Sequence, residues 1–420
     1  MPFQEREFVF DCASLDESIS HRNHFDEYVP ETCKIKEWHR APKYGYKEFN
    51  VTLSSATGVT IKNCRLPILP HDFLQRLEQV KEIHLDNSEI KSINETTFPN
   101  GWGLLTLWMS KNDLTVVPRF SFARMPNISE IYLLRNRIRD VHLLAFKEAT
   151  ELKIINLSHN VIEKIHDSFH ALHNLEVLDL SYNFIEYFRV DLDDSKNLKE
   201  LRLANNKIGV LDCSVFDLKA NKILIDASFN HLRGIDLDCD VNLKFLELRV
   251  NHNQLTSLEF PKSKLLNGLT SIDASENHIE SITFHTDFRQ LTKLKLNDNN
   301  LKELDGWKAA MFPNLRDMDI SNNRFKCSYL NGFLKMFPMR IHLTTTEAQR
   351  IRSDGVLRTK KTIHGISCID GNGIDVEHLI IWCLLAVLLT FLCVNIFRQK
   401  YFQNQINEAN VRNNRNATNE

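Results

Sequence analysis

The stretch LEVLDLSYNFI, residues 175–185, decides the fold of this 420-residue chain, because its order of apolar residues and asparagine returns along most of the sequence. The asparagine that corresponds to Asn183 recurs at intervals of 22 to 24 residues, a spacing typical of stacked structural repeats. Cys64 and Ser88 hold the same position in two earlier copies, which gives twelve copies. The ten repeat asparagines are Asn112, Asn136, Asn160, Asn183, Asn206, Asn230, Asn253, Asn277, Asn299 and Asn323.

The apolar positions of the repeat are as regular as its asparagines. The residues five and three positions before each repeat asparagine are apolar in all twelve copies, as Leu178 and Leu180 are before Asn183. The second position after it is apolar from Leu66 to Phe325. A strand directs alternate side chains to opposite faces, so these columns point inward, and only stacking of the coils can bury them. The pattern therefore predicts a solenoid whose stability is a sum of nearest-neighbour contacts.

The composition is that of an ordinary folded protein and gives no sign of catalysis. Hydrophobic residues make up 43% and charged residues 25%, and the net charge of -2 gives no reason to expect a nucleic-acid partner. His166, His170 and His173 have a helical spacing, but no matching cysteine or carboxylate set accompanies them on what should be a variable return arm. We therefore expect exposed histidines, no metal, no cofactor and no enzyme activity.

A membrane span is predicted near the C-terminus. The run LIIWCLLAVLLTFLCVNIF, residues 379–397, contains no charge in nineteen residues and is long enough to cross a bilayer. Asp375 and Glu377 precede it, and Arg398 and Lys400 follow it. By the positive-inside rule the tail is cytoplasmic and the repeats are extracellular, as in a single-pass type I protein of the plasma membrane.

Sequons support this topology and the first residues complicate it. Asn50, Asn94, Asn127 and Asn156 each begin an Asn-X-Ser/Thr sequon on the expected outer side. The opening residues, MPFQEREFVFDCASLDESIS, have no apolar segment typical of a signal peptide. Either a signal peptide lies upstream, which we favour, or the span is a tail anchor and the solenoid is cytosolic.

The pattern LxxLxLxxNxL resembles the animal extracellular leucine-rich-repeat proteins, including Toll-like-receptor ectodomains, from about residue 51 to 325. With its single C-terminal span, the layout looks closest to the membrane-anchored insect leucine-rich immune proteins. The resemblance implies an α/β leucine-rich-repeat solenoid, a horseshoe with a parallel sheet on its concave face. It also implies that each repeat asparagine bonds to backbone groups of its own turn and of the neighbouring coil.

Cysteine placement is interpreted through the same resemblance. Extracellular members of the family cover the ends of the solenoid with small disulfide-held caps, which implies the bridges Cys12 with Cys33 and Cys327 with Cys368. Cys213 and Cys239 fall at nearly equal offsets on adjacent coils and are compatible with a third bridge or with two free buried thiols.

These features divide the chain into five parts. We expect an N-terminal cysteine cap over 1–50, about twelve repeats over 51–326, a C-terminal cap and linker over 327–373, a transmembrane helix over 374–397 and a cytoplasmic tail over 398–420. The sequence departs from secreted insect relatives, which carry a coiled coil after the repeats. It also departs from Toll-like receptors, because 23 residues cannot hold their cytoplasmic signalling domain.

The position four residues before each repeat asparagine should line the concave face. From Asp179 onward the charges at this position alternate in sign, which predicts an intramolecular row of exposed pairs, each worth about 0.5 kcal/mol, rather than a site for a charged ligand. In order, these residues are Thr60, His84, Trp108, Tyr132, Asn156, Asp179, Arg202, Asp226, Arg249, Asp273, Lys295 and Asp319.

The candidate binding site is the N-terminal half of this face. Trp108 and Tyr132 are neighbours there, with His84, Leu134 and Arg135 beside them, and we expect an exposed contact patch. Its partner would be a protein ligand, a co-receptor or a microbial surface molecule. We therefore expect an innate-immune recognition or accessory receptor. The alternatives are a receptor for cell adhesion or neuronal guidance and a cytosolic tail-anchored scaffold.

Overall fold

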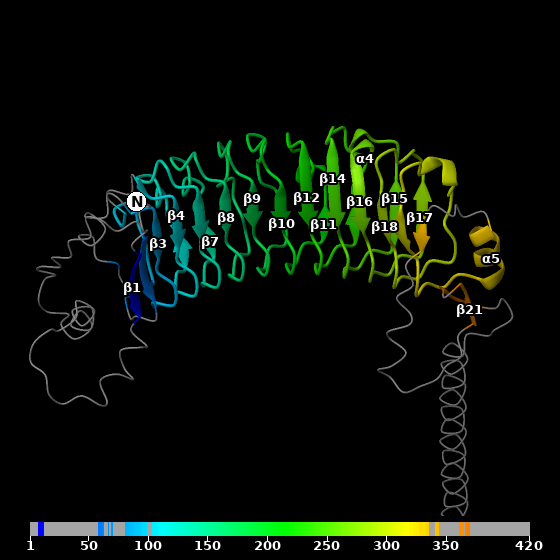
Figure 1. The fold of residues 1–420 in the computed structure, drawn as a ribbon, viewed down its shortest axis with the longest axis horizontal. Helices are drawn as coiled ribbons and strands as arrows, with labels where there is room; N and C mark the ends of the chain where they lie inside the picture. Colours follow the sequence, from blue (N-terminus) through cyan, green and yellow to red (C-terminus); the bar gives the residue numbers. More distant parts are fainter. Residues whose placement is uncertain are drawn as a thin grey trace, which may run out of the picture.

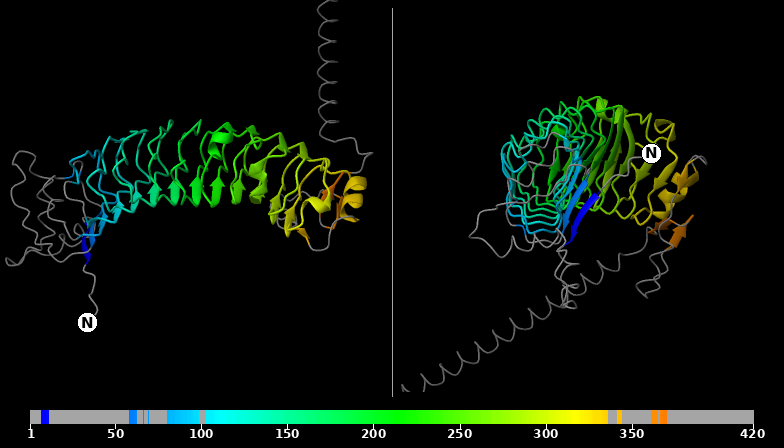
Figure 2. Two further views of the ribbon diagram at one scale, coloured as in Figure 1. Left: turned by 90° about the horizontal axis from the view of Figure 1, so that it is seen from above. Right: turned by 60° about the vertical axis from the view of Figure 1, so that its left-hand side comes forward.

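The protein is a curved solenoid of stacked coils, as a computed structural model shows (Figure 1). The structure describes residues 7–11, 58–62, 66, 69, 80–98, 103–335, 341–343, 361–364 and 366–369. Two further views show one continuous ribbon of strands along the inner side, with the looser return arms outside it (Figure 2). The described part of the chain therefore has an inner layer of strands and an outer layer of return arms, repeated from coil to coil.

Among the described residues, one parallel sheet of fourteen strands runs along the solenoid. Neighbours in the sheet are neighbours in the sequence of coils, so each coil contributes one strand. Its strands are β1 (Glu7–Asp11), β2 (Gly58–Lys62), β3 (Glu82–His84), β4 (Thr106–Trp108), β6 (Glu130–Tyr132), β8 (Ile154–Asn156), β9 (Val177–Asp179), β10 (Glu200–Arg202), β12 (Lys222–Asp226), β14 (Phe245–Arg249), β16 (Leu269–Asp273), β18 (Lys293–Lys295), β19 (Asp317–Asp319) and β20 (His342–Leu343).

The return arms contain little helix among the described residues, so this part of the chain is a β-solenoid rather than the expected α/β fold. Its helices are η2 (Cys213–Val215), α4 (Lys264–Asn267), η3 (Ala309–Met311) and α5 (Cys327–Lys335). Short parallel pairs form elsewhere on the arms, and one antiparallel pair closes the C-terminal end. These pairs are β5 (Val116–Val117) with β7 (Asp140–Val141), β11 (Val210–Leu211) with β13 (Gly234–Ile235), β15 (Ser257–Phe260) with β17 (Ser281–Phe284), and β21 (Lys361–Ile363) with β22 (Ile366–Cys368).

The predicted register is confirmed by the strand pairing. Leu178 pairs with Leu201, and Leu201 pairs with Ile225, so the same repeat position stacks from coil to coil. All three side chains are fully buried. Phenylalanines extend this core into the return arms, where Phe122 and Phe146 stack with ring centroids 5.2 Å apart. The inner columns were predicted, whereas the phenylalanine column was not.

The asparagine ladder is also confirmed. Asn183 is buried, and its Nδ2 donates to the carbonyl oxygens of Leu157 and Leu180, both at 3.0 Å. Its Oδ1 accepts from the backbone N–H of Ile162 at 3.0 Å. Each amide thereby joins its own turn to the preceding coil, which satisfies buried backbone groups that the turn would otherwise leave unpaired.

Ser88 replaces the asparagine in the weaker way that its short side chain allows. Its Oγ donates to the carbonyl oxygen of Ile61 at 3.3 Å. The N–H of Leu66 donates to the backbone oxygen of Ser88 at 2.8 Å, where other coils use the asparagine Oδ1. Cys64 lies outside the described residues.

A left-handed residue precedes the repeat position in eleven consecutive coils. Its φ lies between 51° and 56° throughout, and none of the eleven is glycine. The conformation is costly for non-glycine residues, and it is held by bonds between coils: the N–H of Arg135 donates to the carbonyl oxygen of Ser158 at 3.0 Å, and that of His159 to Ser181 at 2.9 Å. We call this column the strand-end column, because it follows the ends of the strands. It comprises Asn87, Lys111, Arg135, His159, Tyr182, Asn205, Phe229, His252, Glu276, Asp298 and Asn322.

Two disulfides are present among the described residues. Cys327 and Cys368 join α5 to β22 with Cα atoms 4.9 Å apart, as predicted for the C-terminal cap. Cys213 and Cys239 are bonded with Cα atoms 5.5 Å apart, which decides the open alternative in favour of a third bridge. The predicted bridge of residues 12 and 33 lies outside the described part of the chain.

The predicted membrane segment, residues 379–397, also lies outside the described residues. None of the helices that the structure describes has the length and apolar character needed to cross a bilayer. Among the sequon asparagines, Asn94 and Asn127 are exposed, while Asn156 is half-buried in β8. Residue 50 is not among those described.

Candidate functional site

Three planar side chains from β3, β4 and β6 form a stack on the concave sheet, which we call the aromatic ladder. His84 pairs with Trp108 and Trp108 with Tyr132 in the strand register. The ring centroids of His84 and Trp108 lie 5.5 Å apart, and those of Trp108 and Tyr132 lie 3.6 Å apart, with interplanar angles of 8° and 10°. Because the rings cover one another, each side chain is half-buried rather than exposed as expected.

Acidic side chains two residues upstream hold the polar ends of the ladder. The Tyr132 hydroxyl donates to Glu130 Oε2 at 2.9 Å. Burial first, and then Glu130 through its hydrogen bond and charge, raise the pKa of Tyr132 from 10.0 to about 12. His84 Nε2 lies 3.9 Å from Glu82 Oε2, whose side chain is exposed. The ladder thus presents stacked ring faces with carboxylates at its edge.

The two remaining predicted site residues lie on different columns. Leu134 is half-buried two residues after Tyr132. Arg135 is exposed and belongs to the strand-end column, where its charge acts on His159. The pKa of His159 is lowered chiefly by burial and then by Arg135, while Asp179 opposes the shift. The structure therefore brings His84, Trp108 and Tyr132 together and separates Arg135 from them.

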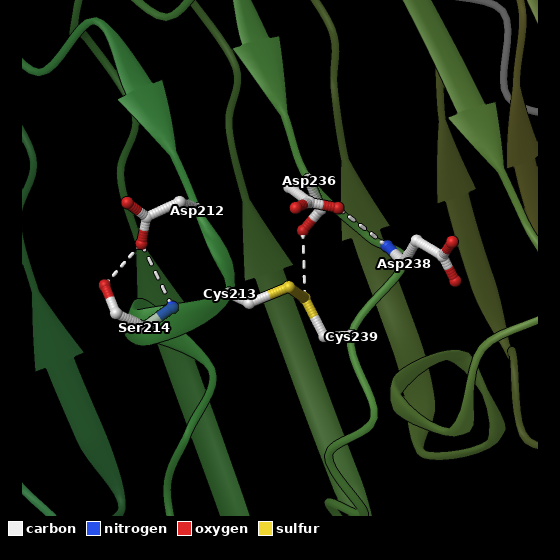
Figure 3. Close-up of a disulfide and its surroundings, with 6 residues drawn as sticks. All are labelled: Asp212, Cys213, Ser214, Asp236, Asp238 and Cys239. Carbon is white, nitrogen blue, oxygen red and sulfur yellow. Dashed lines mark hydrogen bonds between the residues drawn. A yellow bond between two sulfur atoms is a disulfide. The ribbon is translucent and has the colours of Figure 1, made fainter.

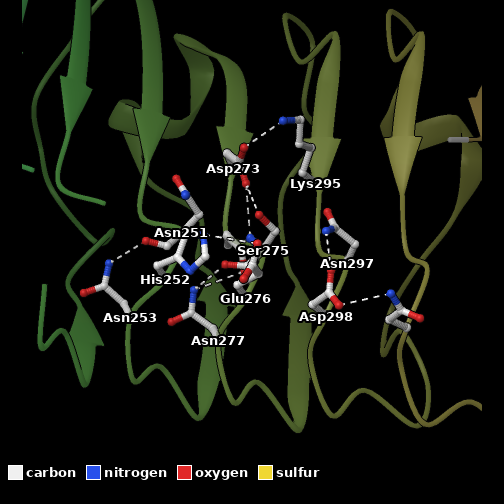
Figure 4. A network of polar contacts seen from close by, with 12 residues as sticks. Asn251, His252, Asn253, Asp273, Ser275, Glu276, Asn277, Lys295, Asn297 and Asp298 are labelled. Carbon is white, nitrogen blue, oxygen red and sulfur yellow. Dashed lines mark hydrogen bonds and ion pairs between the residues drawn. The ribbon is translucent and has the colours of Figure 1, made fainter. Parts of the chain in front are cut away.

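The charged half of the concave face forms pairs, as expected for a self-neutralising row. Lys295 Nζ lies 2.9 Å from Asp273 Oδ2 (Figure 4), and Arg202 Nη1 lies 3.4 Å from Asp179 Oδ2. A third pair joins Arg249 to Asp226 at 3.5 Å.

A serine two residues after each of these aspartates adds a bond that was not foreseen. Asp273 Oδ1 accepts from the Ser275 hydroxyl at 2.6 Å, and Asp226 Oδ1 accepts from the Ser228 hydroxyl at 2.6 Å. Asp226 also accepts from the Ser228 N–H at 3.0 Å. The Asp226 carboxylate is therefore bonded locally as well as to an exposed cation.

One cluster of described residues could suggest metal binding. Cys213, Asp236 and Cys239 are the described residues that bring three potential ligand atoms together. The two sulfurs are bonded to each other and so are not free thiolates (Figure 3). The bridge ties one return arm to the next, which is a structural role.

The three predicted surface histidines are exposed as expected, but carboxylates do accompany them. The next coil places Asp191 Oδ2 at 3.4 Å and Asp194 Oδ2 at 3.8 Å from His170 Nδ1. His173 Nδ1 lies 3.9 Å from Asp194 Oδ1, and His166 Nε2 lies 3.7 Å from an Asp140 oxygen. These acids come from neighbouring arms, so the spacing of the histidines along the sequence did not reveal them.

A second surface escaped the sequence reasoning. Tyr182 and Phe229 of the strand-end column are 49% and 47% exposed, and Phe184 and Tyr187 beside them are 41% and 74% exposed. Tyr187 and Val210 also line an open groove of about 480 Å³ on this flank. Tyr182 and Phe229 each stand one position before a repeat asparagine, and exposure at that position was predicted from the sequence for Arg135 alone.

The comparisons with known proteins agree with the repeat architecture. The family model of the leucine rich repeat matches residues 78–138 and 126–185, so the chain carries leucine-rich repeats. No curated protein sequence matches the chain.

Solved structures are similar in fold at low sequence identity. The crystal structure of a TLR13–ssRNA13 complex is 20% identical, with 69% of this chain and 44% of that chain covered and a TM-score of 0.57. The octameric complex of Latrophilin 3, Unc5D and FLRT2 is 20% identical over 69% of this chain and 83% of that chain, with a TM-score of 0.50. The chain thus spans less than half the length of the TLR13 chain that it matches.

Proposed function

We propose that this protein is a membrane-anchored extracellular receptor of innate immunity, with a recognition or accessory role, and that its aromatic ladder binds the ligand. The ladder carries the proposal, because three stacked planar side chains lie partly exposed on a sheet that is otherwise charged or polar over much of its length. Aromatic side chains of this kind contribute a large share of binding energy at protein interfaces.

The geometry of the ladder suits a partner that brings apolar and cationic groups together. Stacking fixes the Trp108 and Tyr132 rings before the ligand arrives, so little side-chain entropy is lost on binding. Glu82 and Glu130 stand at the edge of the rings and would attract a positively charged group on the partner. A protein or microbial ligand with a lysine or arginine next to an apolar side chain fits both features.

The extracellular and membrane-anchored parts of the proposal have separate support. The two disulfides, Cys213 with Cys239 and Cys327 with Cys368, favour an oxidising compartment. The uncharged run 379–397, followed by Arg398 and Lys400, favours a span with the repeats outside.

Topology is tested on the full chain, expressed in animal cells with a supplied signal peptide. The proposal expects the repeats to be digested by protease added outside intact cells, and it expects the protein to migrate faster after enzymatic deglycosylation. Protection of the repeats in intact cells would refute the extracellular assignment.

Ligand binding is tested with the same cells and with fluorescently labelled, heat-killed bacteria as the probe. Trp108→Ala with Tyr132→Ala should reduce bacterial binding by a factor corresponding to about 2–4 kcal/mol. Lys219→Ala is the matched control, because this exposed lysine lies on a return arm and pairs with Asp193. The proposed site is wrong if the double variant folds normally and binds as the parent does. If the parent itself binds no bacteria but the cells adhere to one another through the ladder, a role in adhesion replaces the immune one.

A further inference from the structure

The strand-end column has a mirrored composition about its middle member. Asn205 is the sixth of the eleven residues. Stepping outward from it, the column carries Tyr182 and Phe229, then His159 and His252, and each step leads one coil further from the centre. The next two steps carry Arg135 opposite Glu276 and Lys111 opposite Asp298, and the outermost step carries Asn87 and Asn322. At equal distances from Asn205, a ring therefore corresponds to a ring and an amide to an amide. A cationic side chain corresponds to an anionic one.

The central part of the column presents two equivalent ring stacks to solvent. His159 stacks on Tyr182 with ring centroids 4.1 Å apart, and Phe229 stacks on His252 at 4.0 Å. Asn205 separates the two stacks. With Tyr182 and Phe229 about half exposed, this is an apolar surface of the kind that marks a contact site.

The two outer parts of the column carry opposite charges, and they differ in whether the charged side chains contact neighbouring side chains. Arg135 and Lys111 are exposed, and neither forms an ion pair with another described residue. On the other side, Glu276 Oε1 lies 3.1 Å from His252 Nε2. Asp298 accepts from Asn322 Nδ2 at 3.0 Å. The acidic half is thereby held in place, while the basic half extends into solvent.

We propose that this column binds the same column of a second copy of the chain, in an antiparallel arrangement about a two-fold axis at Asn205. A two-fold axis that crosses the column at right angles, at Asn205, reverses the direction of the column in the second copy. Each coil before the axis then faces the coil equally far after the axis in the partner. In such an isologous contact, a residue that meets a second residue is met by it in return.

Under this symmetry every step of the column finds a suitable partner. The Tyr182 ring meets the Phe229 ring of the other copy, and Arg135 meets Glu276, with each contact made twice. A neighbouring column places Phe184 and His231 at mirrored positions as well. Lys207 stands in the central coil, but its Nζ lies over its own Phe184 ring, 4.9 Å from the centroid, which directs the two ammonium groups to opposite sides of the axis.

The length of the column fits a modest interface. Ten intervals of about 4.8 Å give a strip about 48 Å long. A specific interface needs about 800 Å² per partner, so a strip this long must be about 17 Å wide. The strand-end column and the column that contains Phe184 supply adjacent rows of side chains for that width. The proposal is independent of the aromatic ladder, which faces the concave side.

Charge exchange in the full-length chain tests the pairing. Two differently tagged full-length chains are co-expressed, and their association is measured by co-precipitation across a range of expression levels. Arg135→Glu alone and Glu276→Arg alone should each reduce self-association at least about 10-fold, because like charges then meet twice. The two single variants should associate with each other as the parent does, because mixing restores both opposite-charge pairs. Asp193→Arg is the control, since Asp193 pairs with Lys219 on the return arms and lies outside both columns.

Cysteine cross-linking tests the axis without changing charge. Asn205→Cys should form a disulfide-linked dimer with itself, because a residue on a two-fold axis meets its own copy. Lys219→Cys, on a return arm, should not exceed the background of the parent chain. The proposal is overturned if the parent chain does not self-associate, if the charge variants associate as the parent does, if the mixed single variants fail to associate, or if the Asn205→Cys protein cross-links no better than the control.

Discussion

Removal of neighbouring repeat asparagines should cost more than the sum of the single removals. The Leu180 carbonyl oxygen accepts from Asn183 Nδ2 and from Asn206 Nδ2, both at 3.0 Å. Asn183→Ala leaves this oxygen with one amide donor and deprives the Ile162 N–H of its acceptor. Asn206→Ala likewise deprives the Ile185 N–H. Only the double variant removes both amide donors from Leu180.

The magnitude follows from the number of buried groups left unpaired. One orphaned buried N–H costs about 1–3 kcal/mol, so each single variant should lose about 2 kcal/mol of unfolding free energy. Asn183→Ala with Asn206→Ala should lose about 5–6 kcal/mol, because the Leu180 oxygen adds a further cost of about 1–2 kcal/mol. Asn183→Ala with Asn253→Ala is the matched control, because these two asparagines share no carbonyl and their effects should add.

Urea denaturation of the full chain, followed by circular dichroism, measures these differences. The analysis needs equal dependence of the unfolding free energy on urea in all variants, since a change would indicate that the solenoid no longer unfolds as one unit. The prediction is refuted if the loss of unfolding free energy in the adjacent double variant exceeds the sum of its single losses by no more than it does in the distant double variant. Single losses well below 1 kcal/mol would show that water enters the turn and replaces the amide.

Three further predictions follow from the local geometry. Because the folded state raises the pKa of Tyr132 from 10.0 to about 12, its stabilising effect should be present below pH 10 and lost between pH 10 and 12, a loss that Tyr132→Phe should abolish in urea titrations. Replacing Cys213 and Cys239 by serine should cost about 3.5 kcal/mol of unfolding free energy from the 26-residue separation, measured against the unreduced parent by denaturation. Gly268→Ala would place a Cβ 1.9 Å from a carbonyl oxygen of the preceding coil and should cost about 3 kcal/mol, whereas Gly234→Ala, with nothing within 4 Å, should leave the melting temperature nearly unchanged.

The fold was predictable where one rule repeats in every coil. The spacing of Asn183 and its counterparts predicted both the register and the buried amide, because each amide satisfies backbone groups that every turn leaves open. The return arms were less predictable, since their residues vary from coil to coil. Cys213 and Cys239 illustrate this, because equal offsets on adjacent arms suit a bridge and two buried thiols equally, and only the backbone positions decide.

The candidate surfaces were predictable only where the chain remains in the strand. Trp108 and Tyr132 were placed correctly as neighbours, but their burial depends on ring stacking that a register does not report. Arg135 was assigned to the same patch because it follows closely in sequence. Its left-handed backbone turns it onto another column. The residues with this backbone are not glycine, so no residue type in the sequence indicated the turn.

The bridge between neighbouring return arms also sets how the solenoid responds to tension. When the two ends are pulled apart, the coils can peel away one at a time, since each is held mainly by its neighbours. The bond from Cys213 to Cys239 prevents the 26-residue separation between them from extending, which withholds about 90 Å of chain. Under force applied along the protein, the coils joined by this bond should therefore not extend. The coils on either side of the bond can unfold independently of each other.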